Sequence, residues 1–278
     1  MNGVKRRVEL NSSLLLCYHR AIMDTCTPNN AAPVLVTAAT HQELDYLVRA
    51  VAPGRADVLL PHEVHSGVIN GVPVLLALTG IGKVNAASSL ALLVERHRPR
   101  LVINTGCAGA YDGSGLGVGD LVVASAEVYG DDGVLTPAGW EPLDFIGIPL
   151  LERKGRRYFN EFPLSFSASE KAMQLAAALG IPLKRGRFVT VSTCSGTMSR
   201  GRELAGRFDA LCENMEGAAA AHVLLMYGID CLELRGISNL VEDRDLSRWD
   251  IPRAVENAQR FVVKYIQSLA FKESGPRE

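Results

Sequence analysis

The stretch LVINTGCAGA, residues 101–110, decides the fold class. Its first four residues form a short apolar run, which is typical of a strand buried on both faces of a sheet. The residues that follow are small and include two glycines, so a ligand can approach the backbone closely. In open α/β sheets, ligands bind beyond the carboxyl ends of the strands. The stretch therefore predicts a buried strand with a binding site at its end, where Ala108 and Gly109 admit a flat ring.

Strand and helix patterns alternate on both sides of this stretch. Asn70-Gly71 separates two β-rich runs, residues 62–69 and 72–78, and predicts a hairpin. Helical patterns cover residues 43–48, 83–97, 170–179, 216–227 and 254–271, and strand patterns cover residues 34–38, 101–104, 119–124, 187–192 and 231–237. This alternation predicts a mostly parallel sheet with helices on both faces.

Residues 130–166 break the alternation and contain four prolines. A long irregular segment inside a compact domain is usually functional or an interface. Because Trp140, Phe145 and Ile148 lie in it, we expect the segment to contact a second subunit.

Length, charge and cysteine spacing limit the class of protein. A chain of 278 residues with 47% hydrophobic residues can bury a full core, and its net charge of -1 gives no electrostatic footprint for nucleic acid or an anionic membrane. The six cysteines include no C-x-x-C pair, which favours a reducing, cytoplasmic compartment and predicts no metal site. We expect an N-terminal extension over residues 1–32, one domain over residues 33–271 and a tail over residues 272–278.

Five short motifs carry the remaining signal, although each is weak when taken alone. The first, Gly80-Ile81-Gly82-Lys83, lacks the spacing of a phosphate-binding loop and is expected to form a tight turn into a helix. In chain order the motifs are Gly80-Ile81-Gly82-Lys83-Val84, Asn104-Thr105-Gly106-Cys107-Ala108-Gly109, Val118-Gly119-Asp120, Asn214-Met215-Glu216-Gly217-Ala218 and Arg235-Gly236-Ile237-Ser238-Asn239. This ordered set resembles the purine nucleoside phosphorylase and nucleosidase superfamily over about residues 33–271.

The resemblance implies an α/β fold, a three-layer α/β/α sandwich around a mixed, mostly parallel central sheet. It also implies cleavage of the N-glycosidic bond of a purine nucleoside, with no cofactor and no metal. Glu43 matches the carboxylate that activates the attacking water, and Glu216 matches the one that holds the ribose hydroxyls. Met215 matches a residue packed under the ribose, and Arg235 a side chain close to the water. Cys107 stands where relatives often have Ser.

Two further positions indicate which base leaves and which nucleophile attacks the sugar. Asn239 occupies the place where adenine-specific relatives carry Asp, so the resemblance implies a 6-oxopurine, hypoxanthine, as leaving group. Backbone contacts to the base are expected from Thr197 and Met198. Asn104 replaces an Arg that phosphorylases use to bind phosphate, which makes water the expected nucleophile.

Within the superfamily the chain is most similar to the futalosine hydrolase branch, and next to 5'-methylthioadenosine/S-adenosylhomocysteine nucleosidases. The first branch hydrolyses futalosine to dehypoxanthine futalosine and hypoxanthine in menaquinone biosynthesis. It implies a cation for the benzoate at the 5' position, and Arg244, Arg248 and Arg153 are the candidates. The resemblance also implies a homodimer or larger homo-oligomer. An inosine-type phosphorylase and a purine-binding protein without catalysis remain the alternatives.

Overall fold

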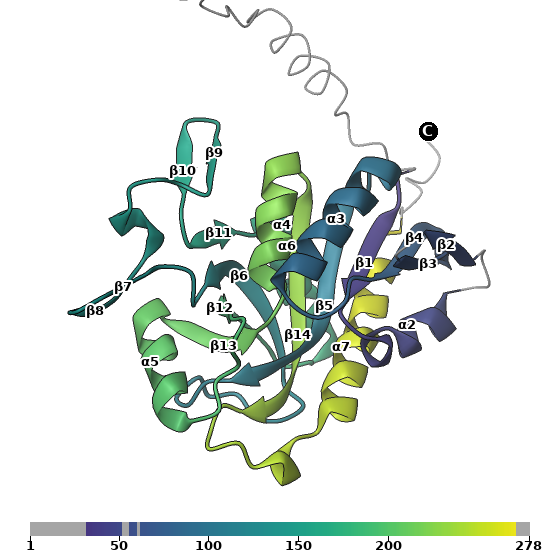
Figure 1. Cartoon of the computed structure of the whole chain (residues 1–278). Coiled ribbons are helices and arrows are strands. Elements are labelled where there is room, and N and C mark those ends of the chain that lie inside the picture. The colour runs from purple at the N-terminus through teal and green to yellow at the C-terminus, as the bar shows by residue number, and fades with distance from the viewer. Residues whose placement is uncertain (1–31, 52–55, 60–61, 271–278) are drawn as a thin grey trace, which may run out of the picture. The chain divides into compact units, whose positions relative to one another are not determined.

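The computed structural model describes residues 32–51, 56–59 and 62–270, all within one compact unit that begins at Ala32. The predicted extension, residues 1–32, and tail, residues 272–278, lie outside the described residues except for Ala32. The main sheet is built from ten strands (Figure 1). They are β1 (Val34–Ala38), β2 (Ala56–Leu59), β3 (His62–Ile69), β4 (Val72–Leu78), β5 (Leu101–Ala110), β6 (Leu121–Tyr129), β11 (Glu161–Pro163), β12 (Leu183–Thr190), β13 (Ala210–Asn214) and β14 (Asp230–Leu240).

The sheet is mixed, as expected. The parallel pairings are β1 with β4 and β5, β14 with β5, and β12 with β6 and β13. The antiparallel pairings lie at the edges, in β2–β3–β4 and β11–β6, and where β13 meets β5 and β14 meets β6. The longest pairing, between β5 and β14, is parallel and brings the carboxyl ends of both strands together.

Five strands close into a ring. β14 lies between β5 and β6, β12 joins β6 to β13, and β13 returns to β5. Residues that are far apart in the sequence therefore face one another across a short distance. This closure positions the candidate site described below.

Helices cover both faces of the sheet, which confirms the three-layer arrangement. The helices are α2 (Asp45–Ala50), α3 (Lys83–His97), α4 (Phe166–Leu179), α5 (Met198–Phe208), α6 (Gly217–Tyr227) and α7 (Ile251–Gln267). Val34 and Val36 point to the core formed with α2, α4 and α7, while Leu35 points to the core formed with α3 and α6. Figure 1 shows α3 and α6 on the same side of the sheet. Alternate residues of one strand thus supply two cores, as the pleat requires.

The boundaries predicted for the hairpin and for residues 83–97 are confirmed. The prediction that residues 130–166 are irregular is wrong in detail. They hold two small hairpins, β7 (Val134–Thr136) with β8 (Gly139–Glu141) and β9 (Leu151–Arg153) with β10 (Arg156–Tyr158), followed by edge strand β11. Three-residue strands are too short to show an alternating pattern, so no periodic signal marks them.

The sequence analysis also missed α5 and β13. Gly201 and Gly206 lower the helix propensity of α5, which conceals its pattern. Gly201 is nevertheless required by packing, because a Cβ there would lie 2.6 Å from Cγ1 of Val241.

None of the helices in the described part of the chain is long and apolar enough to cross a membrane.

Candidate active site

Four residues from separate elements meet where β5 and β14 pair. Glu43 ends the short 3-10 helix η1 (His41–Glu43), Cys107 lies on β5, Glu216 precedes α6, and Arg235 lies on β14. Nη1 of Arg235 lies 3.2 Å from the Cys107 carbonyl oxygen and 3.5 Å from Oε2 of Glu216, and Oε1 of Glu43 accepts from the Cys107 N–H at 3.0 Å. The structure thus brings these four predicted residues together. We call Glu43, Glu216, Arg235 and Cys107 the carboxylate cluster.

Glycine at position 106 allows the Glu43 carboxylate and the Arg235 guanidinium to approach each other. A Cβ on Gly106 would lie 2.4 Å from Oε1 of Glu43 and 2.7 Å from Nη1 of Arg235. Any larger residue would separate the carboxylate from the guanidinium. The Thr105-Gly106-Cys107 motif therefore serves the cluster directly.

Glu43 is held by hydrogen bonds that leave it able to act as a base. The backbone N–H and the hydroxyl of Thr40 each donate to Oε2 of Glu43 at 2.9 Å. With the Cys107 N–H on Oε1, three of about four acceptor positions of the carboxylate are occupied. The remaining position can accept a proton from a substrate water.

Glu216 is fixed between the N-termini of two helices. Its Oε1 accepts from the N–H of Gly82, at the start of α3, at 2.9 Å. The Asn214 side chain accepts from the N–H groups of Glu216 and Gly217, at 3.0 and 2.7 Å, at the start of α6. The Gly80–Lys83 motif forms the expected turn, and it also orients a carboxylate of the site.

Arg235 is buried and charged. Burial alone would lower the pKa of Arg235, but Glu233, Glu216 and Glu43 outweigh burial and raise the pKa above its ordinary value. A fixed cation therefore lies beside Glu216 and near Glu43.

Asn239 lies at the opposite end of the site from Glu43, beside a β-bulge. The register between β14 and β5 shifts between Ile237 and Asn239, so Ser238 is the extra residue. The Ser238 hydroxyl donates to Oδ1 of Asn239 at 2.8 Å, and Nδ2 donates to the Leu240 carbonyl at 3.0 Å. A Cβ on Gly109 would lie 3.1 Å from Nδ2. Because an amide carries two N–H donors, one remains available to a base.

The other predicted contact residues surround these two ends. Ala108 is buried next to Cys107, and Met215 is half-buried between Asn214 and Glu216. Thr197 begins α5, and the backbone N–H of Met198 donates to Oδ1 of Asp243 at 3.1 Å. A contact from the Met198 N–H to a purine would therefore replace its bond to Asp243.

The three candidate arginines lie in different surroundings. Arg244 has a left-handed φ of 25° and lies over the Trp249 ring, with its guanidinium carbon 5.4 Å from the ring centroid. Arg248 is exposed and pairs with Glu242 at 2.7 Å. Arg153 packs over Gly228 at the C-terminal end of α6, whereas Glu216 lies at the N-terminal end. A helix of eleven residues is about 16 Å long, which separates Arg153 from the carboxylate cluster of its own chain.

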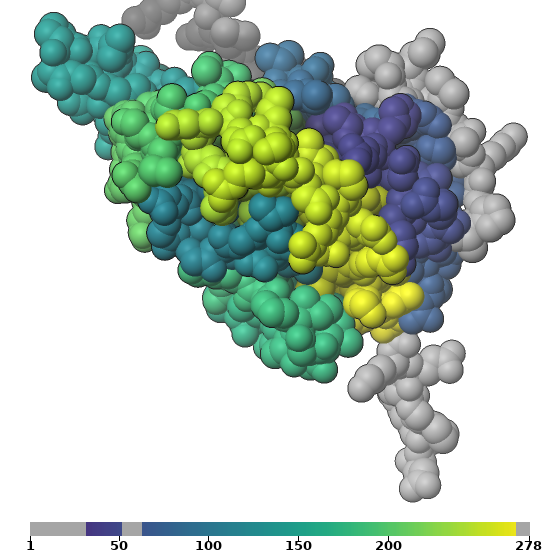
Figure 2. All heavy atoms as spheres, turned by 90° about the horizontal axis from the view of Figure 1, so that it is seen from below, coloured from purple at the N-terminus to yellow at the C-terminus, as the bar shows by residue number. Residues whose placement is uncertain are grey.

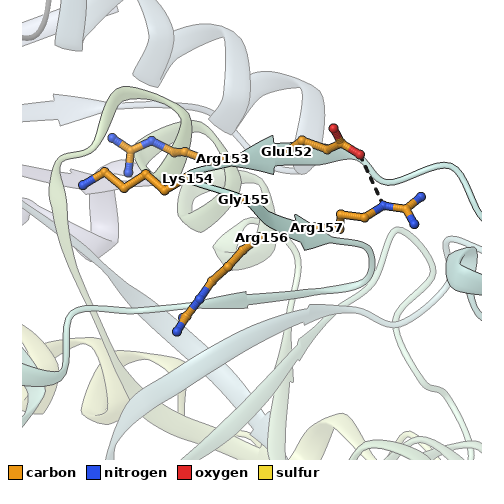
Figure 3. A pocket seen from close by; sticks show the side chains of 6 residues that line it. All are labelled: Glu152, Arg153, Lys154, Gly155, Arg156 and Arg157. Carbon is orange, nitrogen blue, oxygen red and sulfur yellow. Dashed lines mark ion pairs between the residues drawn. The ribbon is translucent and has the colours of Figure 1, made fainter.

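A hollow on the β9–β10 hairpin holds several of the exposed cations (Figure 3). In Figure 3, Glu152 pairs with Arg157 while Arg153, Lys154 and Arg156 extend from the hairpin. No member of the carboxylate cluster lines this hollow. It is a surface feature of the hairpin, separate from the candidate active site.

Figure 2 shows the molecule from below the view of Figure 1. The chain between β14 and α7 lies there beside the loop that follows β5. The Gly119 N–H donates to the Ile237 carbonyl at 2.8 Å, and Asn257 donates to the Gly119 carbonyl at 2.8 Å. The Val118-Gly119-Asp120 motif therefore ties the carboxyl end of β14 to α7.

Several residues of the site were missed by sequence reasoning. Thr40 could have been found, because Thr40 and Glu43 have the T-x-x-E spacing of a capping box. Glu213, directly before the Asn214 motif, anchors the loop that leads to Thr197 and Met198, because it accepts from the Ser195 N–H and hydroxyl at 2.8 and 2.6 Å. Glu127 and Glu233, considered below, gave no sequence signal because each is one acidic residue in an apolar strand.

Cys107 is not a thiolate. Burial, with a further contribution from Glu43, raises the pKa of Cys107 to about 12. We expect the pH profiles of kcat for the wild type and Cys107→Ser to have the same shape between about pH 7 and 9, because the thiol stays neutral there. An alkaline limb that the Ser variant lacks would show that the thiol titrates during turnover.

The fold is shared with solved nucleosidases. The structure matches that of 5'-methylthioadenosine/S-adenosylhomocysteine nucleosidase from Neisseria meningitidis with a TM-score of 0.75 and 24% identity, covering 85% of this chain and 99% of the other. It matches futalosine hydrolase from Helicobacter pylori with a TM-score of 0.74 and 22% identity, covering 86% and 98%. At these identities the likeness establishes a nucleoside phosphorylase-like α/β fold.

The sequence comparisons define the family. Residues 33–267 match the model of the phosphorylase superfamily, and the chain belongs to that family. It is 38% identical over 199 residues to futalosine hydrolase from Thermus thermophilus, which covers 72% of this chain and 82% of the relative. It is 32% identical over 239 residues to 5'-methylthioadenosine/S-adenosylhomocysteine nucleosidase from a Geobacillus species, covering 85% and 98%.

Proposed function

We propose that this protein is a purine nucleosidase that hydrolyses futalosine to dehypoxanthine futalosine and hypoxanthine, a step towards menaquinone. The observation that carries the proposal is the carboxylate cluster, in which Glu43 and Glu216 flank a buried Arg235. Water adds to the anomeric carbon as the N-glycosidic bond breaks, and it gives its proton to Glu43. The ionised Glu216 binds the ribose hydroxyls and stabilises positive charge on the sugar. The departing base takes up a proton from solvent and leaves as neutral hypoxanthine, and Glu43 returns the proton of the water to solvent, so the reaction consumes one water.

Asn239 supports a 6-oxopurine as the leaving base. Its remaining amide N–H can donate to a 6-oxo group or to N7 of the purine, and it cannot act as a strong acid. Hypoxanthine offers an acceptor at position 6, whereas adenine offers a donor. The amide therefore matches hypoxanthine better than adenine.

Arg244 is our proposed partner for the benzoate carboxylate at the 5' position. Burial first, and then Glu213, raise the pKa of Cys194, which precedes Ser195, and the charge of Arg244 opposes this rise. Arg248 already forms an ion pair with Glu242 on the surface. The Arg244 guanidinium carries no ion pair among the described contacts and can form a bidentate pair with a carboxylate.

Water is the proposed nucleophile because Asn104 has no part in binding an anion. Its Oδ1 accepts from the Thr37 hydroxyl at 2.9 Å, and its Nδ2 donates to Glu233 at 2.8 Å. Asn104 is buried, and both ends of its amide bind other side chains of the protein. The alternative, an inosine-type phosphorylase, requires turnover that depends on added phosphate.

A second candidate is a 5'-methylthioadenosine/S-adenosylhomocysteine nucleosidase. The observation that favours it is the extent of the alignment. The Geobacillus nucleosidase aligns with this chain over 98% of its own length. The 38% identity to futalosine hydrolase covers less of both chains.

Base release from futalosine, inosine and methylthioadenosine, in phosphate-free buffer and in phosphate, separates these functions. We expect hypoxanthine release from futalosine at the same rate in both buffers. Preferred adenine release from methylthioadenosine would favour the second candidate, and a requirement for phosphate would favour the phosphorylase. If no nucleoside releases its base, the remaining alternative is a purine-binding protein without catalysis.

We propose that the protein acts as a homodimer or larger homo-oligomer in the cytoplasm. Phe145 and Ile148 are 63% and 71% exposed on the segment over residues 130–166, which is an unusual density of apolar surface. Trp140 instead packs on the Phe208 ring of α5, with 5.8 Å between centroids. The free thiols of Cys107, Cys194, Cys212 and Cys231 support a reducing compartment.

Light scattering tests the assembly. The wild type is expected to have at least twice the mass of one chain, and Phe145→Asp with Ile148→Asp to shift it towards the monomer, because charges would be buried at the contact. Val68→Asp, on the distant hairpin, is the control for an exposed apolar residue. A wild type that is monomeric and fully active would contradict the proposal.

A further inference from the structure

A second pair of buried acids lies behind the carboxylate cluster. Glu127 on β6 and Glu233 on β14 are fully buried. Both face the first residue of α6, since a Cβ on Gly217 would lie 2.0 Å from Oε1 of Glu127 and 2.9 Å from Oε1 of Glu233. Only glycine leaves room there for both carboxyl groups, which share one small space under the N-terminus of α6. We call Glu127 and Glu233 the buried pair.

Glu233 connects the buried pair to Arg235. Nε of Arg235 donates to Oε1 of Glu233 at 2.7 Å, and Nδ2 of Asn104 donates to Oε2 at 2.8 Å. The other nitrogens of the guanidinium lie 3.5 Å from Oε2 of Glu216. Because a guanidinium is planar, holding Nε fixes the direction of the two nitrogens that face Glu216.

Glu127 connects the buried pair to the start of α6. Nδ2 of Asn214 donates to Oε1 of Glu127 at 2.7 Å, and the Thr190 hydroxyl oxygen lies 2.8 Å from Oε2. The same Asn214 accepts from the Glu216 N–H, and the same Thr190 oxygen accepts from the Ala218 N–H at 2.7 Å. Glu127 thus supports the two side chains that cap the helix behind Glu216.

Hydrogen counting places a proton on Glu127. The Thr190 hydroxyl has one hydrogen and two close oxygen neighbours, Oε2 of Glu127 at 2.8 Å and Oδ1 of Asn214 at 3.1 Å. If Glu127 were ionised, Thr190 would donate to it, and the Thr190–Asn214 contact would join two acceptors. If Oε2 is protonated, Glu127 donates to Thr190 and Thr190 donates to Asn214, so every contact is a hydrogen bond.

The surrounding charges agree with this assignment. Burial first, and then the nearby Glu233, raise the pKa of Glu127 well above its ordinary value. Burial also raises the pKa of Glu233, but Arg235 and Asn104 oppose that rise. Thr190, Arg235 and Asn214 oppose the rise in the pKa of Glu127 without outweighing it. Tyr129, Cys212 and Cys231 also lie near Glu127, and burial raises their pKa values, so they stay neutral.

We propose that the buried pair is a positioning device in which Glu127 stays protonated and Glu233 stays ionised, and that it holds Arg235 and Glu216 in place for the ribose. Neither residue of the pair touches substrate. The roles of Arg235 and Glu216 rest on the proposed function, whereas the proton on Glu127 does not.

Two matched amide substitutions test the proposal. Glu127→Gln replaces a protonated acid by an amide that donates to Thr190 and accepts from Asn214, so kcat for futalosine is expected to stay within about threefold of the wild type. Glu233→Gln places an amide N–H₂ against a donor, either Nε of Arg235 or Nδ2 of Asn104, and kcat is expected to fall at least about tenfold. Equal losses in both variants would overturn the assignment.

Unfolding in urea at several pH values tests the proton directly. Between the ordinary pKa of Glu and the raised pKa of Glu127, the folded protein binds one more proton than the unfolded chain, so its stability falls as the pH rises. In this pH window we compare the equilibrium constants for unfolding of the wild type and of Glu127→Gln. Their ratio, wild type to variant, is expected to rise about tenfold per pH unit. Glu161→Gln, on exposed β11, is the control and should keep the wild-type slope.

The kcat measurement and the unfolding measurement test different parts of the proposal. Identical slopes for the wild type and Glu127→Gln would overturn the protonated Glu127, whatever the enzyme does. A wild type that releases no base would overturn the proposed function and leave the unfolding result valid. If Glu233→Gln does not fold, the comparison of the wild type with Glu127→Gln still decides the proposal.

Discussion

Glu43→Gln is expected to lower kcat for futalosine by about 100-fold or more, because the amide cannot accept the proton of the attacking water. The effect should lie mainly in kcat, since KM reflects contacts to the ribose and base made by other residues. In the structure Glu43 already accepts three hydrogen bonds, from Thr40 and from the Cys107 N–H. The carboxylate is therefore held in place before substrate binds, as general base catalysis requires.

The same three donors make a control necessary for Glu43→Gln. The new amide N–H₂ would meet a donor from Thr40 or Cys107, and this could displace the side chain as well as remove its charge. Urea unfolding and the KM for futalosine report such a displacement, while Glu256→Gln, an exposed glutamate of α7, controls for the loss of a surface charge. An unchanged kcat in Glu43→Gln would remove Glu43 from the mechanism.

Asn239→Asp is expected to reduce the preference for futalosine over methylthioadenosine by about 10- to 100-fold, the effect of mispairing one buried polar group. The wild-type amide donates to a 6-oxo group or N7. Asp instead offers an acceptor for the 6-amino group of adenine. The ratio of kcat/KM for the two substrates measures the change.

The structure adds a reason why Asp at position 239 would act as an acid. Nδ2 of Asn239 lies 3.0 Å from the Leu240 carbonyl oxygen, so a carboxylate oxygen in its place would face another acceptor. That contact favours the protonated form, whose single O–H donates to the Leu240 carbonyl until it is transferred to N7 of the departing adenine. Asn70→Asp, in the turn of the β3–β4 hairpin, is the matched control. A wild type that cleaves methylthioadenosine as well as futalosine would exclude Asn239 as the residue that selects the base.

The sequence by itself determined part of the local structure and indicated candidate residues for the site. The Asn70-Gly71 turn and the helix over residues 83–97 were predicted with the observed boundaries, because turn chemistry and helical periodicity are written in neighbouring residues. The motifs around Cys107, Glu216 and Arg235 were recognised because their order along the chain is itself a pattern. Glu43 was recognised in the same way, although it is one polar residue in a helical stretch.

Tertiary structure alone decided how these residues work together. Closure of β5, β14, β6, β12 and β13 into a ring brings Glu127 and Glu233 under α6, and no periodic pattern encodes which strands close. The bulge at Ser238 positions Asn239, and the glycine at position 106 admits Glu43 beside Arg235. The physical reason is range. Periodicity and turn propensity act over a few residues, whereas the contacts of this site join residues far apart in the sequence, such as the Gly82 N–H and the Glu216 carboxylate, 134 positions apart.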